Sequence, residues 1–529
     1  MLSSVRYILL FSLSFIITPA WAADKIVSYE ISEPNSFLPA LTPTEHRLGT
    51  VAVDKIEVTP ILWTHKDDND FDTLKTLFDS LPVHTASPTT FSLKMLLLSS
   101  LGTFPGNHKE LARLQLEQLT AMGDDEILMA KSTTEPFEKI RVERLLLQSH
   151  IKEACAKSAA TPAFYTSTFW PELSILCHID RKEYAKAKLE FDLMDEGKQE
   201  VPSYLEPLIA KIIGESDAAL PEALTIPQNA LHFALLGKAK INFSMHIAEL
   251  TPIMQRAIAL NPMQPFPIRL VAGEAAFRSG SISADDLTTL YMKMHFQSSE
   301  LADFTPDDNP YEGTAQGRAL LYQYSHNQHI DTTIAAAIRA FTEDGYKDIA
   351  LAIFLPDVIN VSSNIKNITS DELLDVLLAG NQLPPVTAWL TNGKATKSHK
   401  ARIALLLAIA TNRQALPFGE LAYSDPVFTE RLILLLDALG YAIPETAWNQ
   451  LSKMPFTYRA TVMGRAVSTL LKQAGEQHRK GALVIATLLA LGGHKANEID
   501  NNSIAMIVRL LSENGFKKEA RSLALEALL

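Results

Sequence analysis

A single stretch, residues 161–197, decides the fold: TPAFYTSTFWPELSILCHIDRKEYAKAKLEFDLMDEG. In its first half, four apolar residues recur at the i, i+4, i+7, i+8 spacing of one helix face: Phe169, Leu173, Leu176 and Cys177. In its second half, the spacing is i, i+3, i+7, i+10: Tyr184, Ala187, Phe191 and Met194. The polar residues 179–182 predict a tight turn, and Gly197 predicts the helix end because glycine adopts the left-handed cap without strain. The stretch therefore predicts a hairpin of two short helices.

Similar signals recur along the chain and indicate degenerate repeats. The turn GYKDIA at 345–350 resembles GFKKEA at 515–520, with a near variant, EYAKA, at 183–187. Glycine is scarce, at 22 of 529 residues, and sustained strand patterns are nearly absent. We predict an all-α fold, an α-α superhelix of degenerate tetratricopeptide-like hairpins in two lobes. The alternative is a set of ordinary helical hairpins in a globular α domain.

The ends of the predicted units follow from breaks in the helical pattern. Residues 1–22 hold one basic residue, Arg6, then an apolar run and the small residues Ala20 and Ala22. This predicts a signal peptide cleaved after Ala22 and a location in the periplasm, with secretion beyond it left open. Residues 23–64 are rich in proline and predict an extended arm. Two helical-repeat lobes follow at 65–303 and 314–529, separated by the linker FTPDDNPYEG at 304–313.

The charge balance limits the partners that the chain can have. The formal net charge is −12, which disfavours nucleic acid and anionic membrane surfaces as partners. The most apolar segments, near 403–410, 431–439 and 482–491, are each too short to span a membrane, so we expect no transmembrane segment in the mature chain. We expect protein partners in the periplasm or envelope.

The chain has two cysteines, Cys155 and Cys177, which lie 22 residues apart. An isolated pair in an oxidising compartment predicts a disulfide that ties one helix to the first helix of the hairpin at 161–197. The alternative is two buried thiols.

Several polar clusters could carry chemistry, and each has a structural alternative. Four acids fit positions of a calcium loop, but its glycine is missing and the run enters a helix, so an acidic helix start is expected: Asp68, Asp70, Asp72 and Asp79. His326 and His329 form an HxxH pair without a nearby acidic ligand, which is typical of solvated helix ends.

Two further polar clusters also have a structural alternative. Asp307, Asp308 and Glu312 could form an acid/base pair but fit a solvated loop. Arg141 and Arg144 could bind an anion but fit ion pairs along a helix. The sequence contains no HExxH, GxSxG, GxxxxGK[ST] or GxGxxG motif. We therefore expect no catalytic residue, cofactor or metal.

Together the signal peptide and six segments resemble a family: RVERLLL (141–147), EAC (153–155), the stretch from Phe169 to Cys177, AQGRALLY (315–322), TAWL (387–390) and GFKKEARSLALEA (515–527). The chain is similar to uncharacterised exported α-helical proteins of alphaproteobacteria, sometimes labelled antifreeze proteins. The resemblance covers most of the mature chain and implies no catalytic residues. More distantly, the architecture resembles periplasmic helical-repeat accessory proteins of the flagellar motor.

These observations predict a non-catalytic periplasmic scaffold that mediates protein–protein interaction in the envelope, as an accessory of a machine such as the flagellar motor. Two alternatives stay open. One is an envelope enzyme or enzyme subunit acting on peptidoglycan, which would need an acid with a raised pKa in a deep cleft. The other is a carrier of an apolar ligand.

Overall fold

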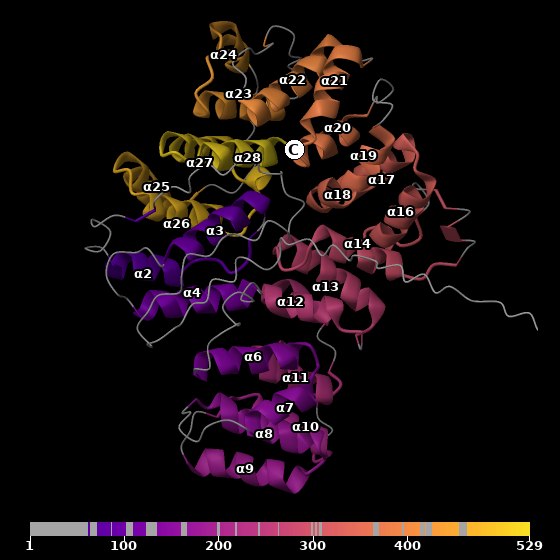
Figure 1. Ribbon diagram of the computed structural model, residues 1–529, viewed down its shortest axis with the longest axis vertical. Coiled ribbons are helices and arrows are strands. Elements are labelled where there is room, and N and C mark those ends of the chain that lie inside the picture. The colour runs from indigo at the N-terminus through magenta and orange to yellow at the C-terminus, as the bar shows by residue number, and fades with distance from the viewer. Residues whose placement is uncertain are drawn as a thin grey trace, which may run out of the picture.

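The structure is a computed structural model (Figure 1). It describes residues 62–63, 71–85, 87–101, 109–122, 135–159, 167–197, 201–216, 219–241, 244–262, 264–297, 300–301, 304–305, 309–362, 370–393, 396–412, 418, 426–453 and 463–529. The predicted signal peptide and all but two residues of the predicted arm lie outside this part. The described part holds 25 α-helices and no strand, which confirms the all-α prediction.

The helices of the first half of the chain are α2 (Phe71–Asp79), α3 (Pro88–Ser100), α4 (Lys109–Met122), α6 (Glu135–Leu147), α7 (Ile151–Ala159), α8 (Phe169–Asp180), α9 (Tyr184–Glu196), α10 (Leu205–Ile213), α11 (Ala230–Lys238), α12 (Pro252–Leu260), α13 (Phe266–Arg278) and α14 (Ala284–Lys293). Those of the second half are α16 (Ala315–Gln328), α17 (Asp331–Glu343), α18 (Lys347–Ile353), α19 (Leu355–Val361), α20 (Asp371–Ala379), α21 (Leu383–Asn392), α22 (Lys397–Thr411), α23 (Pro426–Ala438), α24 (Glu445–Leu451), α25 (Arg465–Glu476), α26 (Lys480–Leu491), α27 (Asn501–Glu513) and α28 (Lys517–Leu528). Short 3-10 turns lie at η2 (Glu222–Leu224), η3 (Ser244–Glu249) and η7 (Ala496–Glu498).

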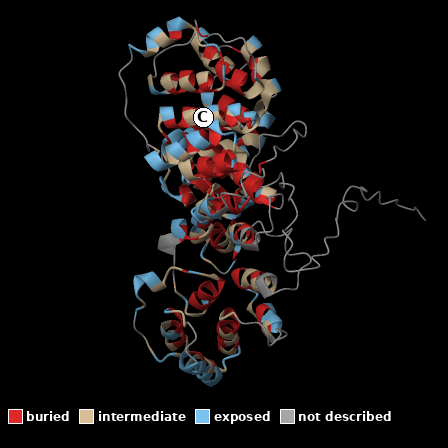
Figure 2. Ribbon diagram, turned by 90° about the vertical axis from the view of Figure 1, so that its left-hand side faces the viewer, coloured by how far each residue is buried: buried red, intermediate tan, exposed pale blue. Residues whose placement is uncertain are grey.

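The last helices of the chain pack against its first helices. Helices α6–α11 form a stack at the lower end of Figure 1, with α9 outermost, and α20–α24 lie at the opposite end. Between them, α25–α28 lie beside α2–α4, and α26 and α28 both contact α3. Figure 2 shows buried residues along the inner faces of the helix layers, while the lowest helix is largely exposed.

Among the described residues, ten helix ends share one turn geometry. In each, a residue in the left-handed conformation is followed by a residue whose N–H donates to the carbonyl five residues earlier, which is the 6→1 bond of a Schellman motif. At Gly345, for example, φ is 81° and Tyr346 N lies 2.7 Å from Phe341 O. The ten left-handed residues are Ser149, Lys182, Gly214, Lys240, Gly280, Gly345, Asn381, Gly440, His478 and Gly515.

The hairpin predicted at 161–197 is formed by α8 and α9, which contact each other. All four residues predicted for the inner face of its first helix are buried: Phe169, Leu173, Leu176 and Cys177. In the second helix Ala187 and Met194 are buried, but Tyr184 is 38% exposed, so its predicted inward position is wrong. Gly197 follows α9 with φ −71°, and the left-handed residue of this hairpin is instead Lys182 in the turn.

The contact between α2–α4 and α25–α28, which we call the seam, is built from interlocking groups. Gly481 N donates to Leu62 O at 3.0 Å. The Trp63 ring lies so close that a Cβ on Gly481 would be 2.2 Å from Trp63 Cζ3. At the start of α3, Thr89 N and Thr89 Oγ1 donate to Glu526 Oε1 at 2.9 and 2.7 Å. The seam therefore needs a residue without a side chain at 481.

The predicted linker at 304–313 is described only in part, because residues 306–308 lie outside the described part. Helices on its two sides contact each other, since α13 and α14 pack against α16 and α18. A division into two lobes at this segment stays a prediction. Of the predicted arm, Leu62 and Trp63 are described, and both are buried.

Among the described residues, no helix has both the length and the apolar composition needed to cross a membrane.

Candidate functional site

A cavity with a volume of about 310 Å³ lies where four parts of the chain meet. His84 and Thr85 come from the loop before α3, and a second group of residues comes from η3, α12 and α13. Tyr346 comes from the turn before α18, and residues 493–498 come from the segment after α26. The fold brings these parts together because the seam returns the end of the chain to its first helices.

A three-membered ion cluster forms one wall of the cavity. Arg278 Nε lies 2.9 Å from Asp348 Oδ2, and its Nη2 lies 3.0 Å from Oδ1. Lys495 Nζ donates to the same Oδ1 at 2.8 Å. Burial alone would raise the pKa of Asp348, but the bonds to Arg278 and the charges of Arg278 and Lys495 outweigh it and hold the pKa below its ordinary value. The cluster joins α13, α18 and the segment after α26.

A second ion pair also contributes to the lining of the cavity, through Glu274. Arg318 of α16 binds Glu274 of α13 with two parallel bonds, Nε–Oε1 at 2.9 Å and Nη2–Oε2 at 2.7 Å. Both side chains are only 3% exposed, and Tyr291 Oη also donates to Glu274 Oε1 at 2.8 Å. Burial, followed by the Glu274 charge, raises the pKa of Tyr291 well above its ordinary value, so this phenol stays protonated. The paired fork geometry fixes the two helices against each other.

The ring of Tyr346 connects the two ion clusters. The guanidinium carbon of Arg278 lies 4.0 Å from the ring centroid, and that of Arg318 lies 3.5 Å from it. A cation over an aromatic face is attracted by the ring quadrupole, more strongly where water is excluded. The turn GYKDIA singled out in the sequence thus supplies Tyr346 to the lining of the cavity and Asp348 to the ion cluster.

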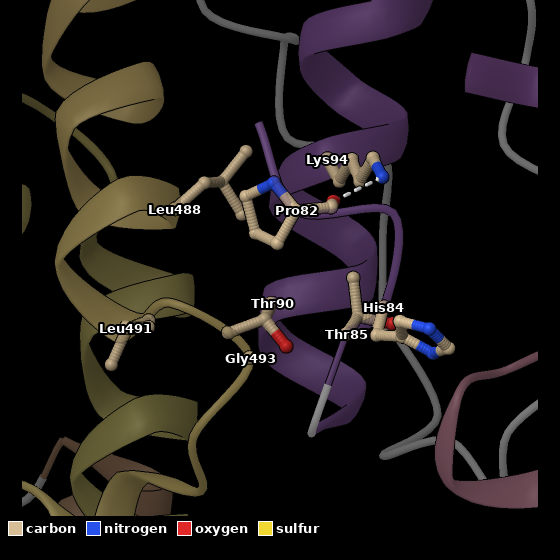
Figure 3. A pocket seen from close by; sticks show the side chains of 8 residues that line it. All are labelled: Pro82, His84, Thr85, Thr90, Lys94, Leu488, Leu491 and Gly493. Carbon is tan, nitrogen blue, oxygen red and sulfur yellow. Dashed lines mark hydrogen bonds between the residues drawn. The ribbon is translucent and has the colours of Figure 1, made fainter. Parts of the chain in front are cut away.

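A small pocket of about 10 Å³ adjoins the cavity and shares His84, Thr85 and Gly493 with it (Figure 3). Lys94 of α3 is 1% exposed, and its Nζ donates to Pro82 O at 2.7 Å and Val83 O at 3.0 Å. Burial without a carboxylate partner lowers the pKa of Lys94 to about 7. Burial and the charge of Lys94 also lower the pKa of His84.

The groups that line the cavity are engaged with one another. Ser279 Oγ donates to Gln255 Oε1 at 3.0 Å, and Thr85 Oγ1 donates to Ser279 O at 3.4 Å. In the described part of the chain the carboxyl groups with a raised pKa are Glu143, Glu172 and Glu526, and none of them lines this cavity. The arrangement fits the fixing of helices or the binding of a polar group better than nucleophilic or acid–base chemistry.

The two cysteines predicted to pair lie together. Cys155 of α7 and Cys177 of α8 have sulfur atoms 2.01 Å apart and Cα atoms 5.6 Å apart. Both side chains are buried, so the bridge lies inside the α6–α11 stack and far along the chain from the cavity residues.

The other sequence candidates are dispersed. Asp72 and Asp79 are exposed near opposite ends of α2, about 10 Å apart along the helix, so they do not share one ion. Asp68, Asp70, Asp307 and Asp308 lie outside the described residues. Glu312 is exposed. In the part of the chain that the structure covers, no three His, Cys, Asp or Glu side chains converge as a metal site.

Arg141 and His326, two of the arginine and histidine candidates, each contact an acid. Arg141 forms an ion pair with Glu138 one turn away, as expected for a helix surface. His326 forms a hydrogen bond with Asp357 of α19, an acid that the local sequence did not indicate. The residues that sequence reasoning missed are Glu274, Arg318, Asp348 and Lys94. Only Lys94 carries a local signal, as a lysine within the apolar run FSLKMLLL.

Comparison with known proteins gives no relative to reason from: no family model matches the chain, and no curated protein or solved structure is detectably similar to it.

Proposed function

We propose that this chain is a non-catalytic periplasmic helical-repeat scaffold that binds protein partners in the cell envelope, as an accessory of an envelope machine such as the flagellar motor. The proposed architecture is an α-α superhelix of degenerate tetratricopeptide-like hairpins in two lobes. The all-α fold and the pairing of Cys155 with Cys177 support this proposal.

The spacing of the shared hairpin turns supports the repeat part of the proposal. The left-handed residues Ser149 and Lys182 are 33 residues apart, and Lys182 and Gly214 are 32 apart. From Gly440 to His478 the spacing is 38. Tetratricopeptide repeats have a period of 34 residues. These spacings of the left-handed residues are close to the period of a tetratricopeptide repeat. The similar turn sequences at 183–187, 345–350 and 515–520 are too far apart to indicate such a period by themselves.

The observation that carries the binding role is the outer face of α9. This helix closes the end of the α6–α11 stack, and of its 13 residues only Ala187 and Met194 are buried. Leu189 and Leu193, one helical turn apart, are each 59% exposed. Terminal units of helical arrays need a polar outer face for solubility, so a leucine pair at this place favours a partner surface.

The alternatives find less support. An envelope enzyme acting on peptidoglycan is favoured by the convergence of polar groups at the 310 Å³ cavity, but the acids with a raised pKa lie elsewhere. A carrier of an apolar ligand would need an apolar interior, whereas in this cavity Glu274, Arg278 and Lys495 are among the lining residues.

The test places a photo-crosslinking amino acid at Leu193 in the full chain, expressed in its native envelope. We expect a discrete protein adduct in the periplasmic fraction, because the side chain is exposed on α9. The matched control is the same group at Lys472, an exposed residue of α25. The adduct should be lost when Leu189→Ser is added. Equal labelling at both positions, or no adduct at well-expressed Leu193, would contradict a binding role for α9.

A further inference from the structure

Two histidine rings lie together at the C-terminal end of α16. His326 is in the last turn of this helix, and His329 caps it. Their ring centroids are 5.4 Å apart, with an interplanar angle of 61°. His326 is half-buried and His329 is exposed, so the space between the rings is open to solvent. Imidazole is a preferred ligand of Zn²⁺, Cu²⁺ and Ni²⁺, and this spacing allows both rings to reach one ion.

A buried carboxylate fixes the proton of His326. Its Nδ1 lies 2.8 Å from Asp357 Oδ1, and the Asp357 side chain is 2% exposed. A carboxylate only accepts hydrogen bonds, so Nδ1 of the neutral ring carries the proton and Nε2 keeps its lone pair. A carboxylate that orients a histidine in this way is the usual second neighbour of a metal-binding imidazole.

Two further contacts hold this arrangement. The His326 ring stacks on Tyr322, with centroids 5.6 Å apart and an interplanar angle of 20°. The second oxygen of Asp357, Oδ2, is buried and has no hydrogen-bond partner among the described residues. The single strong bond of this buried acid is therefore directed at His326, and the ring is held before any ligand arrives.

The backbone at His329 adds to this picture. His329 has φ 51° and ψ 35°, a left-handed conformation that most side chains avoid and that glycine or asparagine usually supplies at a helix end. Its N–H still donates to Ser325 O at 3.2 Å, so the cap itself does not need an imidazole. The cap conformation thus places the His329 ring beside that of His326.

We propose that His326 and His329 bind one divalent first-row transition ion through their ring nitrogens, with Asp357 as a positioning residue. Three protein ligands do not converge among the described side chains, so water completes the coordination. For a nitrogen site of this kind Cu²⁺ binds more tightly than Zn²⁺. This inference goes beyond the scaffold role and does not depend on it.

The test uses the mature full chain with Cu²⁺ and Zn²⁺ alone, by titration calorimetry and by pulsed electron paramagnetic resonance of the Cu²⁺ form. Wild type should show one site with two imidazole nitrogens. The variants His326→Asn and His329→Asn should each lose the two-nitrogen signature. Asparagine suits both places, because its amide can donate to Asp357 and because it tolerates the left-handed conformation. Circular dichroism verifies that each variant folds.

The matched control is His478→Asn. His478 is also a left-handed residue at a helix end, with φ 56°, and its Nδ1 bonds to Asn514 at 2.9 Å. This variant should keep the two-nitrogen site. Asp357→Asn should weaken binding about 10–100-fold, as loss of such a second neighbour does. An unchanged two-nitrogen signal in both His326→Asn and His329→Asn overturns the site, and unchanged affinity in Asp357→Asn overturns the positioning role.

Discussion

Replacement of Lys94 by methionine isolates the energetic effect of a buried amine on the seam. Methionine is unbranched like lysine, is one heavy atom shorter, and removes the charge. It also removes two hydrogen bonds, to Pro82 O and Val83 O, which costs about 1–3 kcal/mol for each carbonyl left buried without a partner. That loss does not depend on pH. The dependence on pH comes from the amine alone.

The direction in which stability changes with pH follows from the two pKa values of Lys94. Its pKa is 10.5 when exposed and about 7 when folded, so between these values the unfolded chain binds more protons. The amine therefore lowers the free energy of unfolding progressively as pH falls from 10.5 to 7, and the effect is constant below pH 7. At 1.36 kcal/mol per pKa unit, the whole window is worth about 5 kcal/mol, of which about 3–4 kcal/mol lies between pH 10 and pH 7.

The assay is urea unfolding of wild type and Lys94→Met, followed by far-ultraviolet circular dichroism at steps from pH 7 to pH 10. We expect the variant to have a lower free energy of unfolding than wild type at pH 10. This difference between the two proteins should become smaller as pH falls. His84 does not contribute in this window, because its pKa lies below its ordinary value of 6.5. Parallel stability curves for the two proteins would refute the argument that a neutral buried amine shapes this pH dependence.

Two further predictions concern the bridge and the buried ion pair. The double variant Cys155→Ser, Cys177→Ser should lower the free energy of unfolding by about 3 kcal/mol, the chain-entropy value for a loop of this size. Reductant should lower the melting temperature of wild type but not that of the double variant. A wild type whose melting temperature does not respond to reductant would contradict the bridge. Arg318→Ala should lower the free energy of unfolding, measured in urea, by about 3–5 kcal/mol, because it leaves Glu274 charged and buried. The control Arg339→Ala breaks an ion pair whose arginine is 60% exposed, and it should cost about 1 kcal/mol or less. Equal losses in the two variants would contradict this ranking.

The local part of the fold was predictable from the sequence. The four residues expected on the inner face of the first hairpin helix are all buried in α8: Phe169, Leu173, Leu176 and Cys177. Helical spacing reports which face of a segment is apolar, and that property depends on near neighbours only. Tyr184 shows the limit of this inference. It lies at the helical spacing expected for an inner face, yet its side chain is 38% exposed.

The candidate sites needed information that lies far along the chain. Arg318 meets Glu274 across 44 residues, and His326 meets Asp357 across 31. No periodicity links such pairs, since they depend on which helices pack together. The HxxH motif was visible, but its carboxylate was not, and without that carboxylate the pair reads as two solvated side chains.

The seam also has a consequence for how the chain folds. The bonds between Thr89 and Glu526 join residues 437 positions apart, and nine of the 13 residues of α3 are buried. Contacts of such long sequence separation form late, because the entropy of closing the loop must be paid first. Until α26 and α28 arrive, α3 presents leucines to solvent on most of its circumference. Before these contacts form, the apolar surface of α3 is therefore exposed to aggregation.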